Sequence, residues 1–409
     1  MRILFVALQF PVPVTNGYKM RSWSLLQALA AEGHEISLVY FQEPGDGRPE
    51  DLPGSVCREL TAVPLRFTSL SARGDYWRRG LAAFCRRPYA SDRFFSPLMR
   101  ERIREILGLH HFDLIISDTA FSMLNLPSSE VPVALNAHNL EHMILKRYLA
   151  HESNPFKLAY GWLESWKLRN WEVEACSQAT WVMCCSHHDR LMFEELCPSI
   201  QAVVVPNIVD VSSYRPAEDV EEPVLIYQGG MDWYPNRDAV EYLVFEILPI
   251  LRGLVPHFRV IVAGRNPSAE FRQRFADIPE VSFTGTVSDM RPQIAKAAVC
   301  VVPLRIGSGT RLKILEAGAM GKPTVSTTVG AEGLELTDGS DILIADQPRA
   351  FAEAVAGLLS DPARRRSLGR AARRQVEEHY SMSVLRKSIG ALSALVQNSA
   401  RRQEVASFV

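Results

Sequence analysis

The sequence has few of the features that mark disulfide-bonded, nucleic-acid-binding or membrane-spanning proteins. Its seven cysteines show no C-x-x-C spacing, so neither a disulfide framework nor a zinc site is predicted, and we expect a reducing, cytoplasmic location. The apolar run after Arg2 stops at Gln9, too short for a signal peptide, and no window reaches the ~18 apolar residues of a membrane span. A net charge of -1 gives no global basic character, so nucleic acid is not an expected partner.

What the chain does have is enough length and apolar content for two domains. At 409 residues it exceeds what one hydrophobic core usually serves. Its hydrophobic content of 47% and charged content of 22% are typical of globular proteins, so each domain can bury a core of its own. The boundary is predicted near Pro206, shortly before an acidic stretch at residues 218–223. One domain is therefore expected at residues 1–206 and a second at residues 207–380.

Both halves alternate short apolar runs with segments of helical period. Strands are expected at residues 3–7, 34–40, 113–117, 131–136, 180–185 and 202–205, and then at 224–227, 259–263, 281–283, 299–302, 323–326 and 341–345. Helices are expected at residues 23–30, 141–177 with a break near Pro155, 348–359, 362–379 and 384–397. This order predicts an α/β fold with two Rossmann-like, doubly wound domains. Function is then expected in a cleft at the carboxyl ends of both sheets.

The strongest chemical signal lies after the apolar run at residues 299–302. A glycine loop with the sequence GSGT, residues 307–310, separates that run from a segment of helical period. The first N–H groups of a helix carry the positive end of its dipole, and glycines let an anion approach the backbone. Thr310 is expected to be the N-cap, and Arg311 and Lys313 add cations in the first turn, where a bound anion explains them. Two interpretations stay open: a phosphate-binding loop, or a tight turn followed by two solvated cations.

Residues 73–104 interleave arginines with aromatic residues in a way that the rest of the chain does not. Such a stretch suits a peripheral contact with the inner face of the plasma membrane or with an anionic acceptor. It equally suits a solvated helix face whose aromatic residues reach the core, and both interpretations stay open.

Ordered motifs in both halves resemble those of family 4 glycosyltransferases, in particular the branch of bacterial exopolysaccharide assembly. In the second half these are YQGGMDWYPN at residues 227–236, VIVAGRNP at 260–267, FTGTVSDMRP at 283–292 and GSGTRLKILEAGAMGKPTVSTTVGAEGL at 307–334. In the first half, residues 1–29 and the stretch LNAHNLEH at 135–142 resemble the acceptor domain. The stretch VVPNIVDVSSYRP at residues 204–216 resembles the hinge between the two domains.

The resemblance implies a GT-B fold and a retaining transfer of a hexose from a UDP- or GDP-sugar to a hydroxyl. The implied acceptor is a saccharide or lipid-linked saccharide in cell-surface polysaccharide synthesis. No carboxylate is clearly placed as a covalent nucleophile, so we expect same-face substitution in which the departing phosphate accepts the proton of the acceptor. The sequence has no Asp-x-Asp element, so no metal and no cofactor besides the donor are expected. The last segment, residues 381–409, is expected to form a helix that crosses back to the first domain.

Site residues follow from their positions in these motifs. His138 is expected to orient the donor hydroxyls and the pyrophosphate, and Lys313 and Arg311 to neutralise charge on the leaving group. Glu316 matches the glutamate that contacts the ribose. The other expected donor-binding residues are Asn16, Gly17, Gly229, Gly230, Arg265, Gly285, Val287, Ser308, Gly309 and Thr310.

Two departures from the family pattern keep other functions open. Ser308 stands where the family has the first glutamate of a pair, and Met231-Asp232 stands where a basic pair is expected. Arg265, Arg311 or Lys313 would then neutralise the phosphate charge. A sugar-nucleotide epimerase and a non-catalytic nucleotide-sugar-binding protein remain as alternatives. A dinucleotide-dependent oxidoreductase is a weaker one, because no G-x-G-x-x-G spacing follows the first strand of either half.

Overall fold

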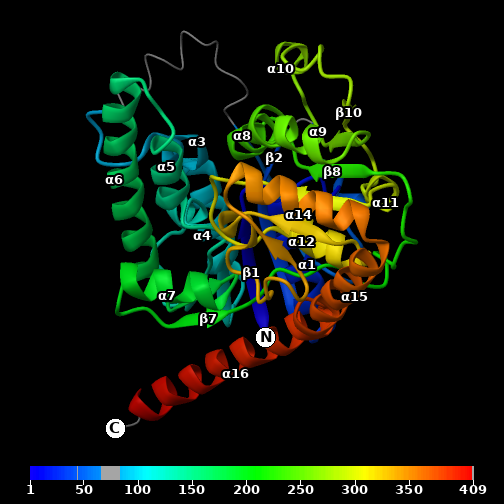
Figure 1. Cartoon of the computed structure of the whole chain (residues 1–409). Coiled ribbons are helices and arrows are strands. Elements are labelled where there is room, and N and C mark those ends of the chain that lie inside the picture. The colour runs from blue at the N-terminus through cyan, green and yellow to red at the C-terminus, as the bar shows by residue number, and fades with distance from the viewer. Residues whose placement is uncertain (44, 66–82, 408–409) are drawn as a thin grey trace. The chain divides into compact units, whose positions relative to one another are not determined.

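The computed structural model describes residues 1–43, 45–65 and 83–407, which fall into two compact units (Figure 1). One unit comprises Met1–Pro206 together with Met382–Val409, and the other comprises Asn207–Ser381. Each unit is an α/β domain built on a parallel sheet of its own, which confirms the predicted fold class.

The first unit has a seven-stranded sheet in the order β3-β2-β1-β4-β5-β6-β7, in which every neighbouring pair is parallel. Its strands are β1 (Arg2–Ala7), β2 (Glu35–Gln42), β3 (Glu59–Pro64), β4 (Leu114–Ser117), β5 (Val133–Asn136), β6 (Trp181–Cys184) and β7 (Ala202–Val204). Its helices are α1 (Gly17–Ala31), α3 (Tyr89–Phe94), α4 (Pro97–Leu109), α5 (Glu141–Leu149), α6 (Pro155–Gln178), α7 (His187–Leu196) and α16 (Met382–Ser407), with short 3-10 turns η1 (Pro49–Asp51) and η2 (Ser122–Asn125).

The central strands of this sheet are covered on both faces, which explains their continuous apolar sequence. All of Ile3 to Ala7 in β1 and all of β4 are buried. Strands β2 and β3 lie on one side of β1 and strands β4 to β7 on the other, so the strand order switches between β1 and β4. The carboxyl ends of β1, β4 and β5 lie at this switch point. The loops that follow these three strands carry the polar residues described below.

The last helix, α16, belongs to this first unit. His34, which follows α1, has its Nε2 2.9 Å from the hydroxyl of Ser393, and Arg386 donates to Glu32 at 2.7 Å. These contacts, with the buried residues Leu385 and Ile389, hold α16 against α1.

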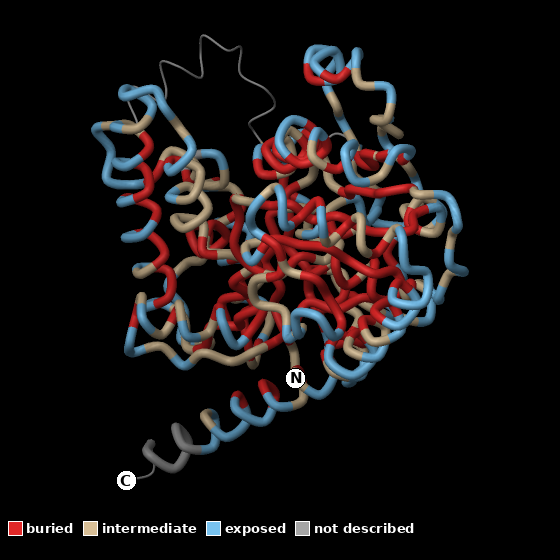
Figure 2. The backbone as a smooth tube through the Cα atoms, viewed as in Figure 1, coloured by how far each residue is buried: buried red, intermediate tan, exposed pale blue. Residues whose placement is uncertain are grey.

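The second unit has a six-stranded parallel sheet in the order β10-β9-β8-β11-β12-β13. Its strands are β8 (Val224–Gln228), β9 (Arg259–Ala263), β10 (Val281–Gly285), β11 (Val299–Val302), β12 (Thr324–Ser326) and β13 (Leu343–Ile344). Its helices are α8 (Tyr234–Tyr242), α9 (Leu248–Leu254), α10 (Ala269–Gln273), α11 (Arg291–Ala295), α12 (Leu312–Ala319), α13 (Thr328–Ala331), α14 (Pro348–Ser360) and α15 (Pro362–His379), with the π turn η3 (Leu243–Ile247) joining α8 to α9. The buried core of this unit lies on and around the sheet, and Figure 2 marks buried residues in red.

The predicted strands are present with ends that differ by at most two residues. The apolar pattern does not predict β3, because β3 is an edge strand in which Val63 alone is buried. None of the helices in the described part of the chain combines the length and apolar character that crossing a membrane requires.

Candidate active site

The glycine loop joins β11 to α12 in the second unit and needs its glycines. Gly307 has φ of 153° and Gly309 has φ of 73°, conformations that residues with a Cβ rarely adopt. A Cβ on Gly307 would also lie 2.5 Å from Nη2 of Arg311. The loop therefore closes tightly around the guanidinium group of Arg311.

Arg311 is the N-cap residue of α12. The sequence had instead predicted a place in the first turn of this helix. Its guanidinium group donates to the carbonyl oxygens of Ser308 (2.5 Å) and Gly309 and to that of Val329 (3.3 Å), and the residue is 9% exposed. These bonds brace the loop from within. The buried charge of Arg311 still adds positive potential at the start of the helix.

The predicted N-cap role of Thr310 is wrong. The backbone stays extended through Arg311, so α12 begins one residue later than expected, and no side chain caps it. Thr310 instead accepts a hydrogen bond from Nδ2 of Asn207 at 2.7 Å. This bond ties the loop to the first residue of the second unit.

Lys313 projects from the first turn of α12 toward two polar side chains, Tyr227 and Asn236, and we name these three residues the Lys313 pocket. Its Nζ donates to the hydroxyl of Tyr227 (3.1 Å) and to Oδ1 of Asn236 (3.0 Å), and lies 4.3 Å from the centre of the Tyr227 ring. Burial, with the nearby charge of Arg311, lowers the pKa of Lys313 to about 7. Because both hydrogen-bond acceptors are neutral, an anion entering this pocket would supply the counter-charge that they do not.

Asn236 does not act as the N-cap of helix α8. Helix α8 begins at Tyr234, so Asn236 lies within its first turn. Its Oδ1 accepts from the Tyr227 hydroxyl at 2.8 Å, and its Nδ2 donates to the carbonyl of Gly230 at 2.9 Å. A Cβ on Gly229 would lie 2.7 Å from Cγ of Asn236, so the glycine makes this close approach possible. Sequence reasoning missed Tyr227 and Asn236 as members of the Lys313 pocket.

Glu316 lies one turn after Lys313 on the same face of α12. Its Oε1 accepts a hydrogen bond from the hydroxyl of Tyr214 at 2.9 Å. Burial raises the pKa of Glu316 to about 7, and burial together with Glu316 raises the pKa of Tyr214. A second polar group therefore lies beside the Lys313 pocket.

The turn after β8 carries the next predicted residues, Gly229 and Gly230. On its other side, Arg265 donates from Nε (3.1 Å) and Nη2 (3.0 Å) to Oδ2 of Asp232. A Cβ on Gly230 would lie 2.5 Å from Oδ1 of Asp232 and 3.3 Å from Arg265. The structure thus brings Gly229, Gly230 and Arg265 together, with Asp232 as the counter-ion that the sequence analysis did not assign.

Gly285 and Val287 lie at the same edge of this sheet. Gly285 ends β10 with φ of 69°, and the half-buried Val287 follows it. Arg265 follows β9, and β10 is the strand next to β9. Gly285 and Val287 are at the carboxyl end of β10. They share the sheet edge with the Lys313 pocket.

In the first unit, Asn16 and Gly17 form the start of α1. Asn16 is the N-cap: its Oδ1 accepts from the backbone N–H of Lys19 at 2.8 Å, and its Nδ2 donates to Gln9 at 3.3 Å. Gly17 is exposed and begins the helix. Both lie in the segment that follows the carboxyl end of β1.

His138 follows β5, at the switch point of the same sheet. Its Nε2 lies 2.9 Å from Oδ1 of Asp118, which also accepts from Nδ2 of Asn136 at 2.6 Å. The hydroxyl of Ser22 donates to the other carboxylate oxygen of Asp118 at 2.5 Å, and Tyr18 stacks on the imidazole with ring centres 4.8 Å apart. Asp118 is fully buried, so this network fixes the position of the His138 ring.

Asp118 was not predicted, although a signal for it was available. It comes directly after β4, whose bounds the sequence indicates correctly to within one residue. A polar residue at the carboxyl end of a central parallel strand lies where such sheets place their sites.

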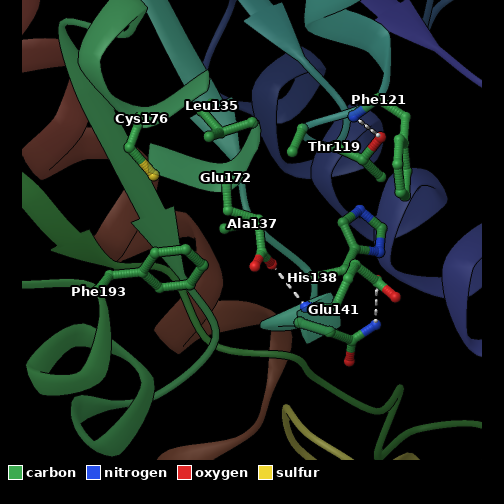
Figure 3. A pocket seen from close by; sticks show the side chains of 11 residues that line it. Thr119, Phe121, Leu135, Ala137, His138, Glu141, Glu172, Cys176 and Phe193 are labelled. Atoms are coloured by element: carbon green, nitrogen blue, oxygen red, sulfur yellow. Dashed lines mark hydrogen bonds between the residues drawn. The ribbon is translucent and has the colours of Figure 1, made fainter. Parts of the chain in front are cut away.

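Behind His138 lies a small enclosed cavity of about 20 Å³, enough for one water molecule (Figure 3). Two carboxylates line it. Glu172 of α6 accepts from the backbone N–H of Glu141 at 2.6 Å and also contacts Nδ1 of His142 at 2.5 Å. Burial and the charge of Glu172 raise the pKa of Glu141 to about 7. Glu172 therefore holds the start of α5, and with it the segment that carries His138.

The Arg and aromatic stretch at residues 73–104 is only partly described, because residues 73–82 lie outside the described residues. In its described part, guanidinium groups lie over Phe94 and Phe95 at 5.3 to 5.8 Å from the ring centres, contributed by Arg87, Arg93 and Arg100. Phe84, in contrast, is 93% exposed.

Comparison with known proteins gives two family matches that together cover most of the chain. Residues 15–213 match the family model "Glycosyltransferase Family 4", and residues 222–361 match the model "Glycosyl transferases group 1". A 44.6 kDa protein in the cps region of Klebsiella pneumoniae is 21% identical over 86% of this chain and 89% of its own length.

Solved structures share the fold at low sequence identity. Sucrose-phosphate synthase from Thermosynechococcus elongatus has a TM-score of 0.76 and 18% identity, covering 98% of this chain and 100% of its own. The Anabaena protein HepE, in complex with UDP and glucose, has a TM-score of 0.65 and 13% identity, covering 96% of this chain and 99% of its own.

Two doubly wound domains with these neighbours define a glycosyltransferase of the GT-B fold. The chain belongs to family 4 of the glycosyltransferases.

Proposed function

We propose that this glycosyltransferase moves a hexose from a UDP- or GDP-sugar to a hydroxyl of a saccharide or lipid-linked saccharide, in cell-surface polysaccharide synthesis. The transfer retains the configuration at the sugar carbon and uses no metal ion. The observation that carries the proposal is the half-buried ammonium of Lys313, held by two neutral oxygens where the first turns of α8 and α12 meet.

This pocket suits a leaving pyrophosphate. Breaking a glycosyl-phosphate bond places negative charge on the departing diphosphate, which preorganised cations and helix N-termini stabilise. Lys313 donates the charge directly, while Arg311 acts through the glycine loop that it braces. Arg265 becomes a third donor when it leaves Asp232.

Glu316 is the proposed contact for the nucleotide ribose. In the described structure its carboxylate has one hydrogen bond, from Tyr214, and an oxygen remains that can accept from a ribose hydroxyl. Gly285 and Val287 are proposed to frame the base, because they lie at the carboxyl end of β10. Ser308 and Gly309 are proposed to meet the donor through the backbone.

His138 is the proposed positioning group for the donor hydroxyls and the pyrophosphate. Asp118 fixes its ring, and Tyr18 stacks against it, so the imidazole has little freedom to reorient. Asn16 and Gly17 are proposed to contribute at the pyrophosphate. In this proposal the departing phosphate, and not His138, accepts the proton of the acceptor hydroxyl.

Two relatives support the substrate classes. The relative from Klebsiella pneumoniae lies in a cps region, which favours polysaccharide synthesis, and HepE is known in complex with UDP and glucose. The lack of an Asp-x-Asp element favours a metal-independent transfer.

The experiment is a thermal-shift panel with UDP, GDP, ADP, dTDP and NAD, each with and without EDTA. Stabilisation by UDP or GDP that EDTA does not change is the expected result, and it identifies the base. No shift with any diphosphate, or a shift with NAD alone, would overturn the proposal. With the donor so identified, an epimerase would convert the sugar without any acceptor, whereas the proposed enzyme forms product only when an acceptor hydroxyl is supplied.

A further inference from the structure

The stretch that opens the second unit contributes two side chains to the proposed donor site. Nδ2 of Asn207 donates to the hydroxyl of Thr310 at 2.7 Å, and the hydroxyl of Tyr214 donates to Oε1 of Glu316 at 2.9 Å. Both bonds lie within the second unit, which begins at Asn207. The bond from Tyr214 has a consequence that the proposed function does not include, because it determines how the Glu316 carboxylate is presented.

The backbone of Tyr214 is held at both of its polar groups. Its N–H donates to the carbonyl oxygen of Asp210 at 2.9 Å, and its own carbonyl oxygen accepts from Nη1 of Arg373 at 2.5 Å. Nη2 of the same guanidinium group donates to the carbonyl oxygen of Val211 at 3.0 Å. Arg373 of α15 therefore fixes the turn at residues 211–214 at its two ends.

The ring of Tyr214 is held as well. The guanidinium group of Arg291, in α11, lies 5.8 Å from the ring centre and donates to the carbonyl oxygen of Ser213 at 3.2 Å. The half-buried ring also packs against buried clusters that contain Ala317 and Ala319 of α12. Three helices thus determine where the hydroxyl of Tyr214 lies.

This hydroxyl fixes one side of the Glu316 carboxylate. Within the described residues Tyr214 is its hydrogen-bond partner, so Oε1 is occupied and Oε2 is available to a ligand. An ionised carboxylate accepts hydrogen bonds and does not donate them, which suits a ribose hydroxyl. Burial raises the pKa of Glu316 to about 7, and the bond from Tyr214 opposes this rise. Tyr214 therefore both orients the carboxylate and favours its accepting form.

We infer that Tyr214 is a positioning residue that acts through Glu316 and makes the site prefer nucleotides with ribose hydroxyls. The inference rests on the proposed function, in which Glu316 contacts the ribose. A 2′,3′-dideoxynucleotide offers no hydroxyl to Oε2, so it loses a hydrogen bond to a charged group. Tyr214→Phe keeps the ring and its packing but removes the bond that holds the carboxylate.

The test is calorimetry of the full-length protein with UDP and GDP, each compared with its 2′,3′-dideoxy form. The two forms share the base and the diphosphate, so the ratio of their dissociation constants measures the preference for ribose. The wild type should prefer the ribose form roughly 10- to 150-fold. In Tyr214→Phe this preference should fall about three- to tenfold, while affinity for the dideoxy form stays within about twofold of the wild type.

The dependence of this preference on pH separates positioning from a merely structural role. Loss of the hydroxyl should raise the pKa of Glu316 further, so the lost preference should be largest near pH 7 and partly restored at about pH 9. The other charged or titratable groups near the pair are Lys313 of α12, Asp289 and Arg291 at the start of α11, and Cys300 of β11. Lys313 titrates in the same range, but in the proposed function it contacts the diphosphate, which both ligands share.

A double variant tests whether Tyr214 acts through Glu316. Glu316→Gln alone should lower the preference for ribose, and Tyr214→Phe/Glu316→Gln should lower it no further, because the second change removes a bond whose acceptor is already altered. Losses that add in the double variant would overturn the inference.

The matched control is Tyr242→Phe, which removes a hydroxyl that donates to the carbonyl oxygen of Asp346 at 2.7 Å in the same unit. It should keep the wild-type preference, and melting temperatures will compare the stability of the variants. An unchanged preference in Tyr214→Phe, or an equal loss in Tyr242→Phe, would overturn the inference and leave the proposed function standing. Failure of the wild type to bind any nucleoside diphosphate would overturn the proposed function and the inference with it.

Discussion

The ammonium nitrogen of Lys313 lies 3.0 Å from Oδ1 of Asn236, so one hydrogen bond joins the first turns of α12 and α8. The positive ends of two helix dipoles therefore meet at a half-buried cation. Such an arrangement is unfavourable in an empty site and favourable once a diphosphate occupies it.

The first prediction is that Lys313→Met weakens nucleotide binding without lowering the stability of the protein. Loss of a charged hydrogen-bond donor should weaken nucleoside diphosphate binding by about 1.5–3 kcal/mol, or roughly 10- to 150-fold. The melting temperature of the protein without nucleotide should not fall, because methionine removes a cation whose burial is costly. Asn236 keeps its hydrogen bond from Tyr227 in this variant.

Isothermal titration calorimetry and a thermal melt measure the two quantities on the same sample. Lys296→Met, at an exposed position in the same unit, is the control and should change neither. A Lys313→Met protein that binds the diphosphate as tightly as the wild type would show that the pocket is not the phosphate site.

The second prediction concerns pH. In the protein without ligand the pKa of Lys313 is about 7, and a bound diphosphate should raise it toward the ordinary lysine value. Binding then takes up a proton, so affinity should fall as the pH rises above about 7, by at most about tenfold per pH unit. Glu316 also has a pKa of about 7, so protonation of its carboxylate should determine how the affinity changes below neutral pH.

Calorimetry at pH 8 in two buffers of different ionisation enthalpy measures this proton uptake. We expect uptake in the wild type and none in Lys313→Met. The stability of the protein without ligand should respond with the opposite sign. Because the pKa of Lys313 is lowered on folding, the unfolded chain binds more protons between about pH 7 and the ordinary lysine value, and this group's cost to the fold shrinks as the pH rises through that range.

The third prediction is a gain of affinity in Asp232→Asn. Asp232 holds Arg265 by two hydrogen bonds and adds a negative charge beside the glycine turn. Since the pair is partly exposed, removing the carboxylate should strengthen diphosphate binding by only about two- to fivefold, and the gain should shrink at high salt.

Glu280→Gln is the matched control, because it breaks a comparable pair with Arg252 elsewhere in the unit and should leave affinity unchanged. Weaker binding in Asp232→Asn would instead mean that the carboxylate orients Arg265 for the ligand.

The sequence predicts the secondary-structure elements better than the contacts between side chains. The strand β11 and the bounds of α15 follow directly from the local sequence. A buried parallel strand is marked by a continuous apolar run, and a long capped helix is marked by its helical period. The edge strand β3 has neither a long apolar run nor two buried faces, so its pairing with β2 decides its conformation.

The site shows the same limit at the level of single residues. Glycine spacing identifies the loop before α12, but whether a polar residue caps a helix or enters a pocket depends on what faces it across the sheet. Asn236 and Thr310 are both residue types that often form N-caps. In the structure Asn236 bonds to Lys313 and Thr310 bonds to Asn207, and both partners are distant in the chain. Such partners are fixed by tertiary structure and leave no local signal.

The last prediction is that Asp118→Asn slows transfer far more than it weakens nucleotide binding. Asp118 accepts from His138, Asn136 and Ser22 at once, whereas an asparagine offers a donor at one of these positions. The imidazole must then change tautomer or turn, so the transfer rate should fall at least about tenfold. Calorimetry with the diphosphate should show a smaller loss of affinity than of rate, because Lys313 and Glu316 lie in the other unit and are unchanged. Asp189→Asn, a buried carboxylate of the same unit that bonds Ser186, controls for lost stability. If the two variants lose activity equally, in proportion to their melting temperatures, Asp118 supports the fold and does not position His138.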